Sequence, residues 1–290
     1  MPLAVGVDVG GTRLRVVGQD DGGRRTAVRE VPVPRTAEAL VDAVAALVRE
    51  VGDGRPSAAT AVGLPGWTGA EVPGWVPQLP FLDGFPLAGA VADRLGGSCV
   101  LLNDAQATLV AEVREGVVAG RSSAVLVAVG TGIGGAVLIN RRLVRGVRGC
   151  AGSFGWLPMN GALPDRDHGG WEQVASGLAL EQMGQPWGGA AGLLEAVRGG
   201  DGAARTITDR YATLLGRGTA ALASVLDPEV VVVAGGISAA MDVLAAPLAR
   251  AHRAAASPAG REVPVLAAAC GPHAGVVGAL HVALAPEVLL

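Results

Sequence analysis

The segment VLLNDAQATLVAE (residues 100–112) places an amide and a carboxylate, Asn103 and Asp104, directly after an apolar run. The run has the character of a buried strand, and the residues from Ala105 onward have the pattern of a helix. A carboxylate at such a junction is either a helix N-cap or a catalytic group. As a catalytic group, Asp104 would act as a base that accepts the proton of a reacting hydroxyl. We favour catalysis, which does not exclude capping.

Two glycine-rich turns have the chemistry of phosphate-binding sites. The stretches DVGGT (8–12) and GTGIGG (130–135) each lie between two apolar, β-branched runs. Such turns expose backbone N–H groups and a Thr hydroxyl, so a pair of them can hold a polyphosphate. Asp8, at the end of the first run, would hold Mg²⁺ through water. The alternative is two ordinary tight turns in which glycine serves only positive φ.

The second turn also matches the G-x-G-x-x-G pattern of dinucleotide-binding proteins. That interpretation requires a helix after the glycines and an acidic residue about 20 positions further on. Here a strand pattern follows, and the next acidic residue is Asp165. A dinucleotide site is therefore disfavoured. The chain contains no Lys, which excludes a lysine-dependent phosphate loop and a Schiff base.

The hydrophobic pattern predicts an α/β protein with an internal repeat. The strand, glycine turn, strand pattern occurs twice, with Gly10 and Gly130 in equivalent positions 130 − 10 = 120 residues apart. We therefore expect two α/β domains with a cleft between them, namely 1–104, completed by the C-terminal helix 273–290, and 105–272. The expected strands are 3–9, 13–19, 26–33, 58–66, 99–102, 123–129, 136–140, 229–234 and 263–267. The expected helices are 38–51, 86–95, 105–115, much of 171–226, 239–256 and 273–284.

Composition narrows the class of protein. Half of the 290 residues are hydrophobic and 17% are charged, which provides for a large core. A net charge of −3 disfavours a nucleic-acid partner. Cys99, Cys150 and Cys270 are far apart and read as reduced thiols. The N-terminal stretch lacks the basic region of a signal peptide, and the longest uncharged run (122–139) fits two strands better than a membrane span. We expect a cytoplasmic protein with no membrane partner.

Several stretches together resemble the ROK family (repressor, open reading frame, kinase). GVDVGGT, LLNDAQATLVAE, VGTGIGGA, EQVASGLAL, DPEVVVVAGGIS and HAGVVGAL occur in the order of that family, from about residue 3 to 282. The chain is similar to its glucokinase-like sugar kinases. The resemblance implies two actin-like (ribonuclease H-like, hexokinase-like) domains, ATP and Mg²⁺ as cofactors, and a homodimer. It also implies phosphorylation of a hydroxyl of a hexose or of a modified or amino hexose.

The resemblance assigns roles to individual residues. Asp104 would remove the proton from the hydroxyl that is phosphorylated. The residues expected to bind the sugar are Gly66, Asn103, Asp104, Ser153, Trp156 and Glu172. Those expected to surround Mg-ATP are Asp8, Gly10, Gly11, Thr12, Arg13, Thr131, Gly132, Gly235 and Gly236. Among these, Arg13 would be a charge partner of the phosphates, and Gly235 and Gly236 would lie against adenosine.

The chain departs from the family after its second glycine turn. The family has Gly-Glu-x-Gly-His there, in which Glu and His contact the sugar and His also binds zinc; this chain has Ser153 and Trp156 in their places. Glucose should therefore be a poor substrate, because Ser and Trp cannot replace both contacts. Trp156, with Trp67, would instead offer an aromatic face to a modified or deoxygenated sugar.

The zinc ligands of the family are also missing. Its cysteine positions correspond to Leu163, Asp165 and Gly170, and no Cys lies between Cys150 and Cys270. We expect no zinc, with Trp156 and its apolar neighbours holding this loop by packing. The nearby Asp165, Asp167 and His168 are interpreted as a solvated polar loop and not as a metal site.

Two functions compete. One is an ATP-dependent sugar kinase, and the other is a non-catalytic, kinase-like sugar-binding or regulatory protein. The presence of Asp104 and of both glycine turns favours the kinase. A DNA-binding repressor is disfavoured because the repressors of the family carry an N-terminal helix-turn-helix domain, whereas the first strand expected here begins at Leu3. An activator ATPase with an iron–sulfur cluster is disfavoured because the cysteines that would bind the cluster are missing.

Overall fold

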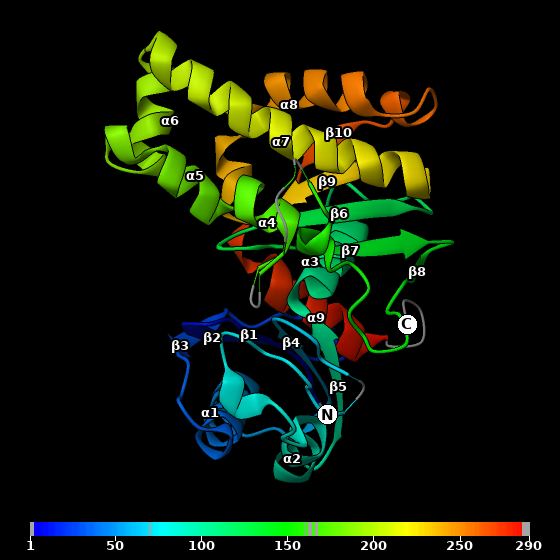
Figure 1. The fold of residues 1–290 in the computed structure, drawn as a ribbon. Coiled ribbons are helices and arrows are strands. Elements are labelled where there is room, and N and C mark those ends of the chain that lie inside the picture. The colour runs from blue at the N-terminus through cyan, green and yellow to red at the C-terminus, as the bar shows by residue number, and fades with distance from the viewer. Residues whose placement is uncertain (1–2, 70, 160, 162–163, 166–167, 286–290) are drawn as a thin grey trace. The chain divides into compact units, whose positions relative to one another are not determined.

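The structure, a computed structural model, describes residues 3–69, 71–159, 161, 164–165 and 168–285. The chain forms two compact units (Figure 1). Unit 1 comprises Met1–Gly120, Arg141–Ala151 and Cys270–Leu290, and unit 2 comprises Arg121–Asn140 and Gly152–Ala269. No helix among the described residues is both long enough and apolar enough to cross a membrane.

A five-stranded sheet forms the centre of unit 1, in the order β3-β2-β1-β4-β5. Its strands are β1 (Leu3–Val9), β2 (Arg13–Gln19), β3 (Arg29–Pro32), β4 (Ser57–Leu64) and β5 (Ser98–Asn103). The strands β1, β4 and β5 are parallel, and the register places Asp8 beside Gly63 and Gly63 beside Leu102. Because parallel strands end at one edge of a sheet, Asp8 and the residues after Leu102 come to the same edge.

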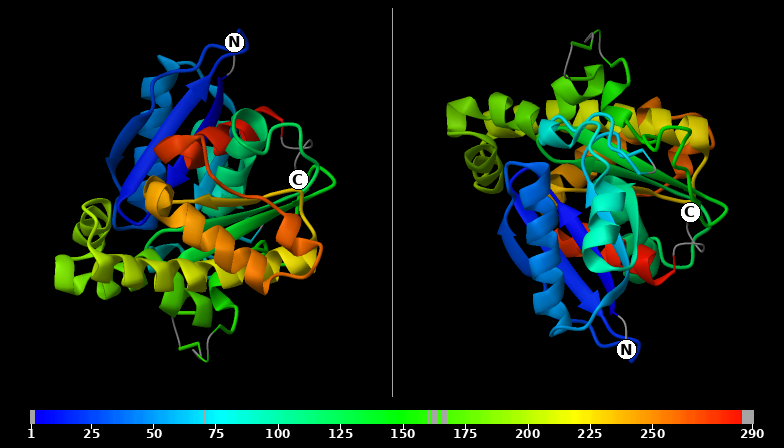
Figure 2. Two further views of the ribbon diagram at one scale, coloured as in Figure 1. Left: turned by 90° about the horizontal axis from the view of Figure 1, so that it is seen from above. Right: turned by 90° about the horizontal axis from the view of Figure 1, so that it is seen from below.

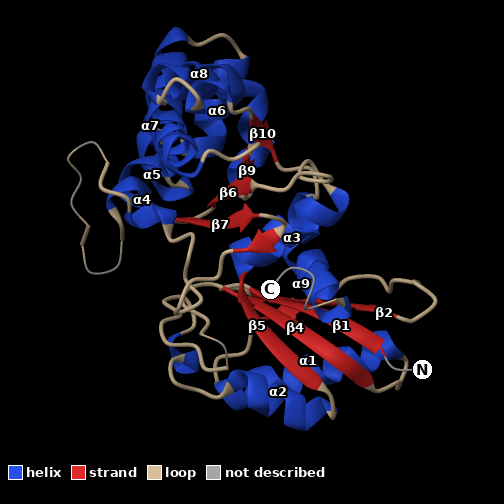
Figure 3. Cartoon of the chain, turned by 90° about the vertical axis from the view of Figure 1, so that its right-hand side faces the viewer, coloured by secondary structure: helices blue, strands red, loops and turns tan. Residues whose placement is uncertain are grey.

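Helices cover both faces of this sheet (Figure 3). On one face, α1 (Ala37–Gly52) and α2 (Leu87–Leu95) share a core with Leu3, Val5 and Val7 of β1. On the other face, α9 (Ala274–Leu284) lies against Gly6, where a Cβ would collide with the carbonyl oxygen of Val276. Successive residues of a strand point to opposite faces, so β1 serves both layers.

The helix α3 (Asp104–Glu115) belongs to unit 1 and packs on α9. The two helices approach so closely that a Cβ on Gly278 would overlap the carbonyl oxygen of Ala107. The domain boundary expected from the sequence, after residue 104, lies one helix before this division. That boundary falls between β5 and α3, whereas the contacts of α3 with α9 keep the helix in unit 1 together with the strand.

A second five-stranded sheet has the order β10-β9-β6-β7-β8. Its strands are β6 (Ala124–Val129), β7 (Ile133–Ile139), β8 (Arg142–Leu143), β9 (Val231–Ala234) and β10 (Val265–Ala267). In both sheets the first two strands form an antiparallel hairpin, and the first strand is parallel to the fourth in chain order. The predicted repeat and the α/β fold class are confirmed.

The helices of unit 2 are α4 (Gly170–Ala175), α5 (Gly177–Met183), α6 (Ala190–Arg198), α7 (Gly202–Leu226) and α8 (Met241–Ala255). The long α7 and α8 run side by side (Figure 2). Their close approach depends on Gly216, where a Cβ would lie 2.7 Å from the Ala251 Cβ. The helix expected over 239–256 begins at Met241, because Gly236–Ala240 form a tighter 3₁₀ turn.

Candidate active site

The junction between β5 and α3 holds the predicted sugar-binding pair in unit 1. Asn103 is the N-cap of α3: its Oδ1 accepts a hydrogen bond from the Ala105 N–H at 2.9 Å, and its own N–H donates to the Gln106 Oε1 at 3.3 Å. The helix therefore begins at Asp104, one residue earlier than expected, and the cap is Asn103 and not Asp104. The Asp104 Oδ1 also accepts from the Ala105 N–H, at 2.8 Å.

Asn103 also contacts the turn after β4. Its Nδ2 donates to the carbonyl oxygen of Gly66 at 3.1 Å, so two predicted sugar-binding residues lie together. Gly66 has φ of +83°, and a Cβ there would collide with the Trp75 carbonyl oxygen. Only glycine fits this position. The amide of Asn103 is thereby fixed in orientation at the edge of the sheet.

The pKa values of the Asp104 and Asp8 carboxyls are both raised. Burial raises the pKa of Asp104 to about 6, with a further contribution from the negative charge of Asp8. Burial also raises the pKa of Asp8, although the Arg15 guanidinium, at 3.2 Å, acts in the opposite direction. Gly63 of β4 pairs with Asp8, and a Cβ on Gly63 would lie 4.0 Å from the Cα of Asp104. A carboxylate that titrates near pH 6 is well matched to accept a proton at neutral pH.

The first glycine turn joins β1 to β2. It is closed by a hydrogen bond from the Gly10 N–H to the Arg13 carbonyl oxygen at 2.9 Å, and Thr12 is exposed at its tip. Gln78 lies against this turn, since a Cβ on Gly11 would overlap its Oε1. The sequence interpretation missed Gln78; its signal was a single amide within the Trp- and Pro-rich loop. Arg13 pairs with Glu30 at 2.7 Å and is 57% exposed.

The two carboxylate oxygens of Asp8 have different surroundings. One carboxylate oxygen, Oδ2, contacts Arg15, while a Cβ on Gly275 would lie 3.1 Å from Oδ1. The absence of a side chain at Gly275 therefore leaves room beside Oδ1. Magnesium keeps several of its waters and binds through one or two carboxylates, so the single Asp8 fits this ion.

The second glycine turn, in unit 2, joins β6 to β7 and contacts Glu172. The Gly130 N–H donates to the Gly132 carbonyl oxygen at 2.9 Å, and Thr131 is exposed. The Glu172 Oε2 accepts from the Ile133 N–H at 2.7 Å, and a Cβ on Gly132 would overlap that oxygen. One predicted sugar-binding residue and two predicted phosphate-binding residues are thus brought together in this unit.

Ser153 and Trp156 lie at the two ends of a short 3₁₀ turn, Phe154–Trp156. Phe154 packs on the backbone of β7, where a Cβ on Gly135 would overlap its ring. Trp156 is 39% exposed, so part of its side chain reaches the surface while the larger part is covered. The expectation that it helps to hold this loop by packing stays a prediction.

Trp171, at the start of α4, anchors this helix. It is fully buried, its Nε1–H donates to the Leu214 carbonyl oxygen at 3.1 Å, and a Cβ on Gly218 would overlap its indole ring. The Trp171 N–H also donates to the Leu157 carbonyl oxygen at 2.8 Å, which joins α4 to the Phe154–Trp156 turn. Trp171 therefore anchors on α7 the helix α4, which also carries Glu172.

In the polar loop before α4, two of the described side chains form a close pair. His168 contacts Asp165 through its Nδ1, at 3.2 Å, and both side chains are exposed. Leu163 and Asp167 lie outside the described residues. Within the described part of the chain, no three His, Cys, Asp or Glu side chains form a group that could hold a metal ion.

A pocket of about 340 Å³ in unit 2 has the character of a nucleoside site (lining residues Val129, Gly130, Gly177, Leu180, Ala190, Ala191, Leu194, Glu195, Arg198, Gly236, Ile237, Ala239 and Ala240). The lining is mainly apolar, with Glu195 and Arg198 as its charged members. Gly235 has φ of +85° and passes so close to β6 that a Cβ would overlap the Val129 carbonyl oxygen. Gly236 has open space beside it. Of the two predicted adenosine-binding glycines, Gly236 lines this pocket and Gly235 packs on Val129, another lining residue.

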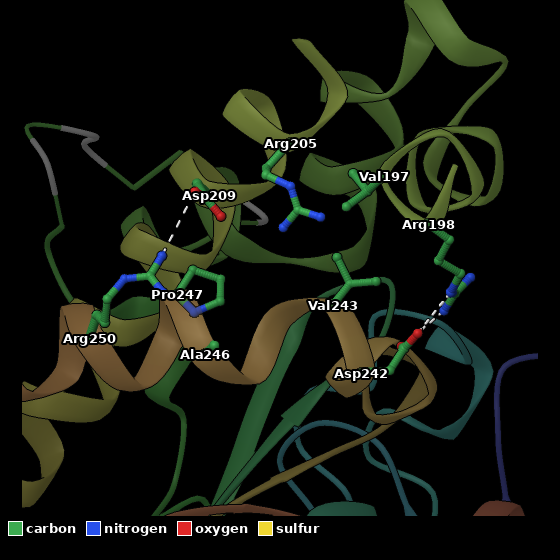
Figure 4. Close-up of a pocket in the computed structure, with 9 residues that line it drawn as sticks. All are labelled: Val197, Arg198, Arg205, Asp209, Asp242, Val243, Ala246, Pro247 and Arg250. Atoms are coloured by element: carbon green, nitrogen blue, oxygen red, sulfur yellow. Dashed lines mark hydrogen bonds and ion pairs between the residues drawn. The ribbon is translucent and has the colours of Figure 1, made fainter. Parts of the chain in front are cut away.

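A second hollow, of about 390 Å³, lies among α6, α7 and α8 (Figure 4). Its charged side chains are largely paired with one another. Arg198 binds Asp242 through hydrogen bonds of 2.8 and 2.9 Å, and Arg250 lies 3.8 Å from Asp209. The apolar pocket beside Gly236 is the better match to a purine.

Comparisons with known proteins agree with this arrangement. The family model described as "ROK family" matches residues 4–286. A glucokinase from Streptomyces coelicolor is 33% identical over the whole of both chains. An N-acetylmannosamine kinase from Yersinia pestis is 30% identical over 84% of this chain and 86% of its own. The crystal structure of a ROK family glucokinase from Streptomyces griseus, in complex with glucose and AMPPNP, has a TM-score of 0.82 at 30% identity, covering 97% of this chain and 99% of that one. With a family model that spans nearly its entire length and a relative matched from end to end, this chain belongs to the ROK family.

Proposed function

We propose that this chain transfers a phosphoryl group from Mg-ATP to a hydroxyl of a hexose or of a modified or amino hexose, with Asp104 as the general base. That the chain is a sugar kinase follows from its family and from full-length relatives that are glucokinases. The observation that carries the role of Asp104 is its raised pKa, about 6, at the edge of the sheet it shares with Asp8. A buried carboxylate in that range binds a proton more readily than an exposed one and is still mostly ionised at pH 7.

The sugar would be held from unit 1 by the β5–α3 junction. The Asp104 carboxylate accepts the proton of the attacking hydroxyl, which makes its oxygen a better nucleophile. The Asn103 amide, fixed by its bonds to Ala105 and Gly66, orients a neighbouring hydroxyl. Glu172, fixed by the Ile133 N–H, is the proposed sugar ligand from unit 2.

The phosphates would be held by the two glycine turns through Gly10, Gly11, Thr12, Thr131 and Gly132. Asp8 would hold Mg²⁺ through water, and the ion supplies neutralisation of the phosphate charge. The exposed Arg13, now paired with Glu30, is a further candidate partner for the phosphates. The adenosine would occupy the pocket beside Gly235 and Gly236, where an apolar lining suits a base.

The preferred sugar should differ from plain glucose. By the sequence resemblance, Ser153 and Trp156 stand where the family pattern has a Glu and a His, and each hydrogen bond to a charged group is worth about 1.5–3 kcal/mol. The partly exposed indole of Trp156 offers an aromatic face to a modified or deoxygenated ring.

Release of ADP across a panel of hexoses, deoxyhexoses, amino sugars and N-acetylated sugars tests the function. Turnover of at least one member supports the kinase. Binding of sugar and Mg-ATP without turnover would favour the alternative, a non-catalytic sugar-binding or regulatory protein. Light scattering will test the further expectation of a homodimer.

The nucleotide site has a separate test. Gly236→Leu places a side chain in the proposed adenosine pocket, so calorimetry should show the loss of Mg-ATP binding while sugar binding persists. The matched control is Gly202→Leu, which also starts a helix and has open space around it. Equal Mg-ATP affinity in the two variants would place the nucleotide elsewhere.

A further inference from the structure

The segment Arg141–Ala151 belongs to unit 1 and contacts the β5–α3 junction. The half-buried Arg145 donates from its Nη2 to the carbonyl oxygen of Leu101 at 2.7 Å and to that of Gly69 at 3.4 Å. Because β5 is the edge strand of its sheet, a carbonyl on its outer side is free to accept such a bond. Arg145 thereby joins β5 to the turn that follows β4.

A second link runs from the same segment to Asn103. The fully buried Gln106 accepts from the Asn103 N–H at 3.3 Å and donates from its Nε2 to the Gly149 carbonyl oxygen at 3.4 Å. Gly149 has φ of +73°, and a Cβ there would lie 3.2 Å from both the Gly69 carbonyl oxygen and the Thr68 Oγ1. The segment thus contacts both the cap of α3 and the turn 66–69.

These contacts form one network around the proposed sugar site. The turn 66–69 is held at Gly66 by Asn103 and at Gly69 by Arg145. The strand β5 is held at Leu101, two residues before Asn103. We propose that Arg145 is a positioning residue, which sets the spacing between β5 and the turn 66–69 and so places Asn103 and Asp104 for the sugar.

An arginine suits this task better than any other side chain. Its planar guanidinium presents several N–H donors in a fixed geometry, so one group can bridge two carbonyl oxygens. Among the described residues the structure gives Arg145 no carboxylate partner, and its bonds go to backbone carbonyls alone. Its role is therefore to fix backbone positions. Because a displacement of about 1 Å can cost about 100-fold in rate, the effect on catalysis should be large for a residue outside the reacting groups.

The inference rests on the proposed function for its catalytic readout, and three variants test it. Arg145→Ala should lower kcat/KM for the best sugar by about 10- to 100-fold and leave the Mg-ATP dissociation constant unchanged. Arg145→Lys should recover only part of the loss, because the lysine ammonium lacks the planar set of N–H donors that lets a guanidinium bridge two carbonyl oxygens. Millimolar guanidinium should partly rescue Arg145→Ala but not the wild type. The control is Arg148→Ala, an exposed arginine of the same segment, which should behave as wild type.

Hydrogen exchange separates this inference from the proposed function. In Arg145→Ala, exchange should become faster at 66–69 and 101–106, whether or not the wild type phosphorylates the sugars tested. A wild type without kinase activity would refute the proposed function and leave this result standing. The inference is overturned if exchange at both stretches is unchanged in Arg145→Ala. It is also overturned if Arg145→Ala lowers both kcat/KM and the affinity for Mg-ATP and guanidinium does not rescue the activity. Should Arg145→Ala not fold, Arg145→Lys is compared with Arg148→Ala by the same criteria.

Discussion

Replacing Asp104 by Asn should make the protein more stable and nearly inactive. Asn has almost the same shape, and its Oδ1 can keep the hydrogen bond from the Ala105 N–H. The substitution therefore removes the charge with little change in packing. Loss of a general base typically costs about 10²- to 10⁴-fold in rate, and kcat should fall by that factor.

The expected gain in stability follows from the pKa of Asp104. Folding raises that pKa from 3.8 to about 6, so the folded state holds the proton more tightly than the unfolded state. The protonated Asp104 therefore stabilises the folded state. This stabilisation is fully present below pH 3.8 and is lost as the pH rises through about 6. At about 1.36 kcal/mol for each pH unit, the ionised Asp104 costs the folded protein about 3 kcal/mol at pH 7 and about half of that at pH 5.

Denaturant unfolding at pH 7, 5 and 4 measures this cost. Asp104→Asn should exceed the wild type in free energy of unfolding by up to about 3 kcal/mol at pH 7, and the difference should nearly vanish at pH 4. The control is Asp93→Asn, an exposed residue of α2, which should change neither activity nor stability. A variant that is no more stable than wild type at pH 7 would refute the argument from burial, and near-normal turnover would refute the base.

Three further outcomes are expected. Elemental analysis should find no stoichiometric zinc, and chelators should not unfold the protein; one zinc per chain would contradict this. Steady-state kinetics should give kcat/KM for glucose below about 10⁴ M⁻¹s⁻¹, and Ser153→Glu with Trp156→His should raise it; an efficient wild-type glucokinase would refute the altered sugar site. Trp171→Ala should lower the free energy of unfolding by about 3–5 kcal/mol, and Gly218→Ala by about 1–3 kcal/mol, as measured by denaturant titration. Stability equal to wild type in either variant would remove Trp171 as the anchor of α4.

Most strands, turns and helices of this fold can be predicted from the sequence, because the patterns that specify them lie within short stretches of the chain. The apolar, valine-rich run LAVGVDV, the glycines that follow β1 and β6, and the apolar face of α1 depend on residues close together in the chain. The repeat of the hairpin pattern around Gly10 and Gly130 predicted two related sheets, and both sheets have the same strand order. The same patterns do not specify the exact ends of these elements. The helix α3 begins at Asp104 because hydrogen bonds make Asn103 its N-cap, and the hydrophobic pattern does not distinguish Asn103 from Asp104 in that role.

The sequence by itself also determined which chemical groups are available to the site: Asp8, Asp104, the glycine turns and the family to which they point. Only the tertiary structure decided how those groups are tuned and held. The pKa of Asp104 depends on burial and on Asp8 across the sheet, and the anchor of α4 is Trp171 because Gly218, far along the chain, leaves room for its indole. Burial, close packing and charge–charge effects join residues that are distant in sequence, so no local pattern encodes them.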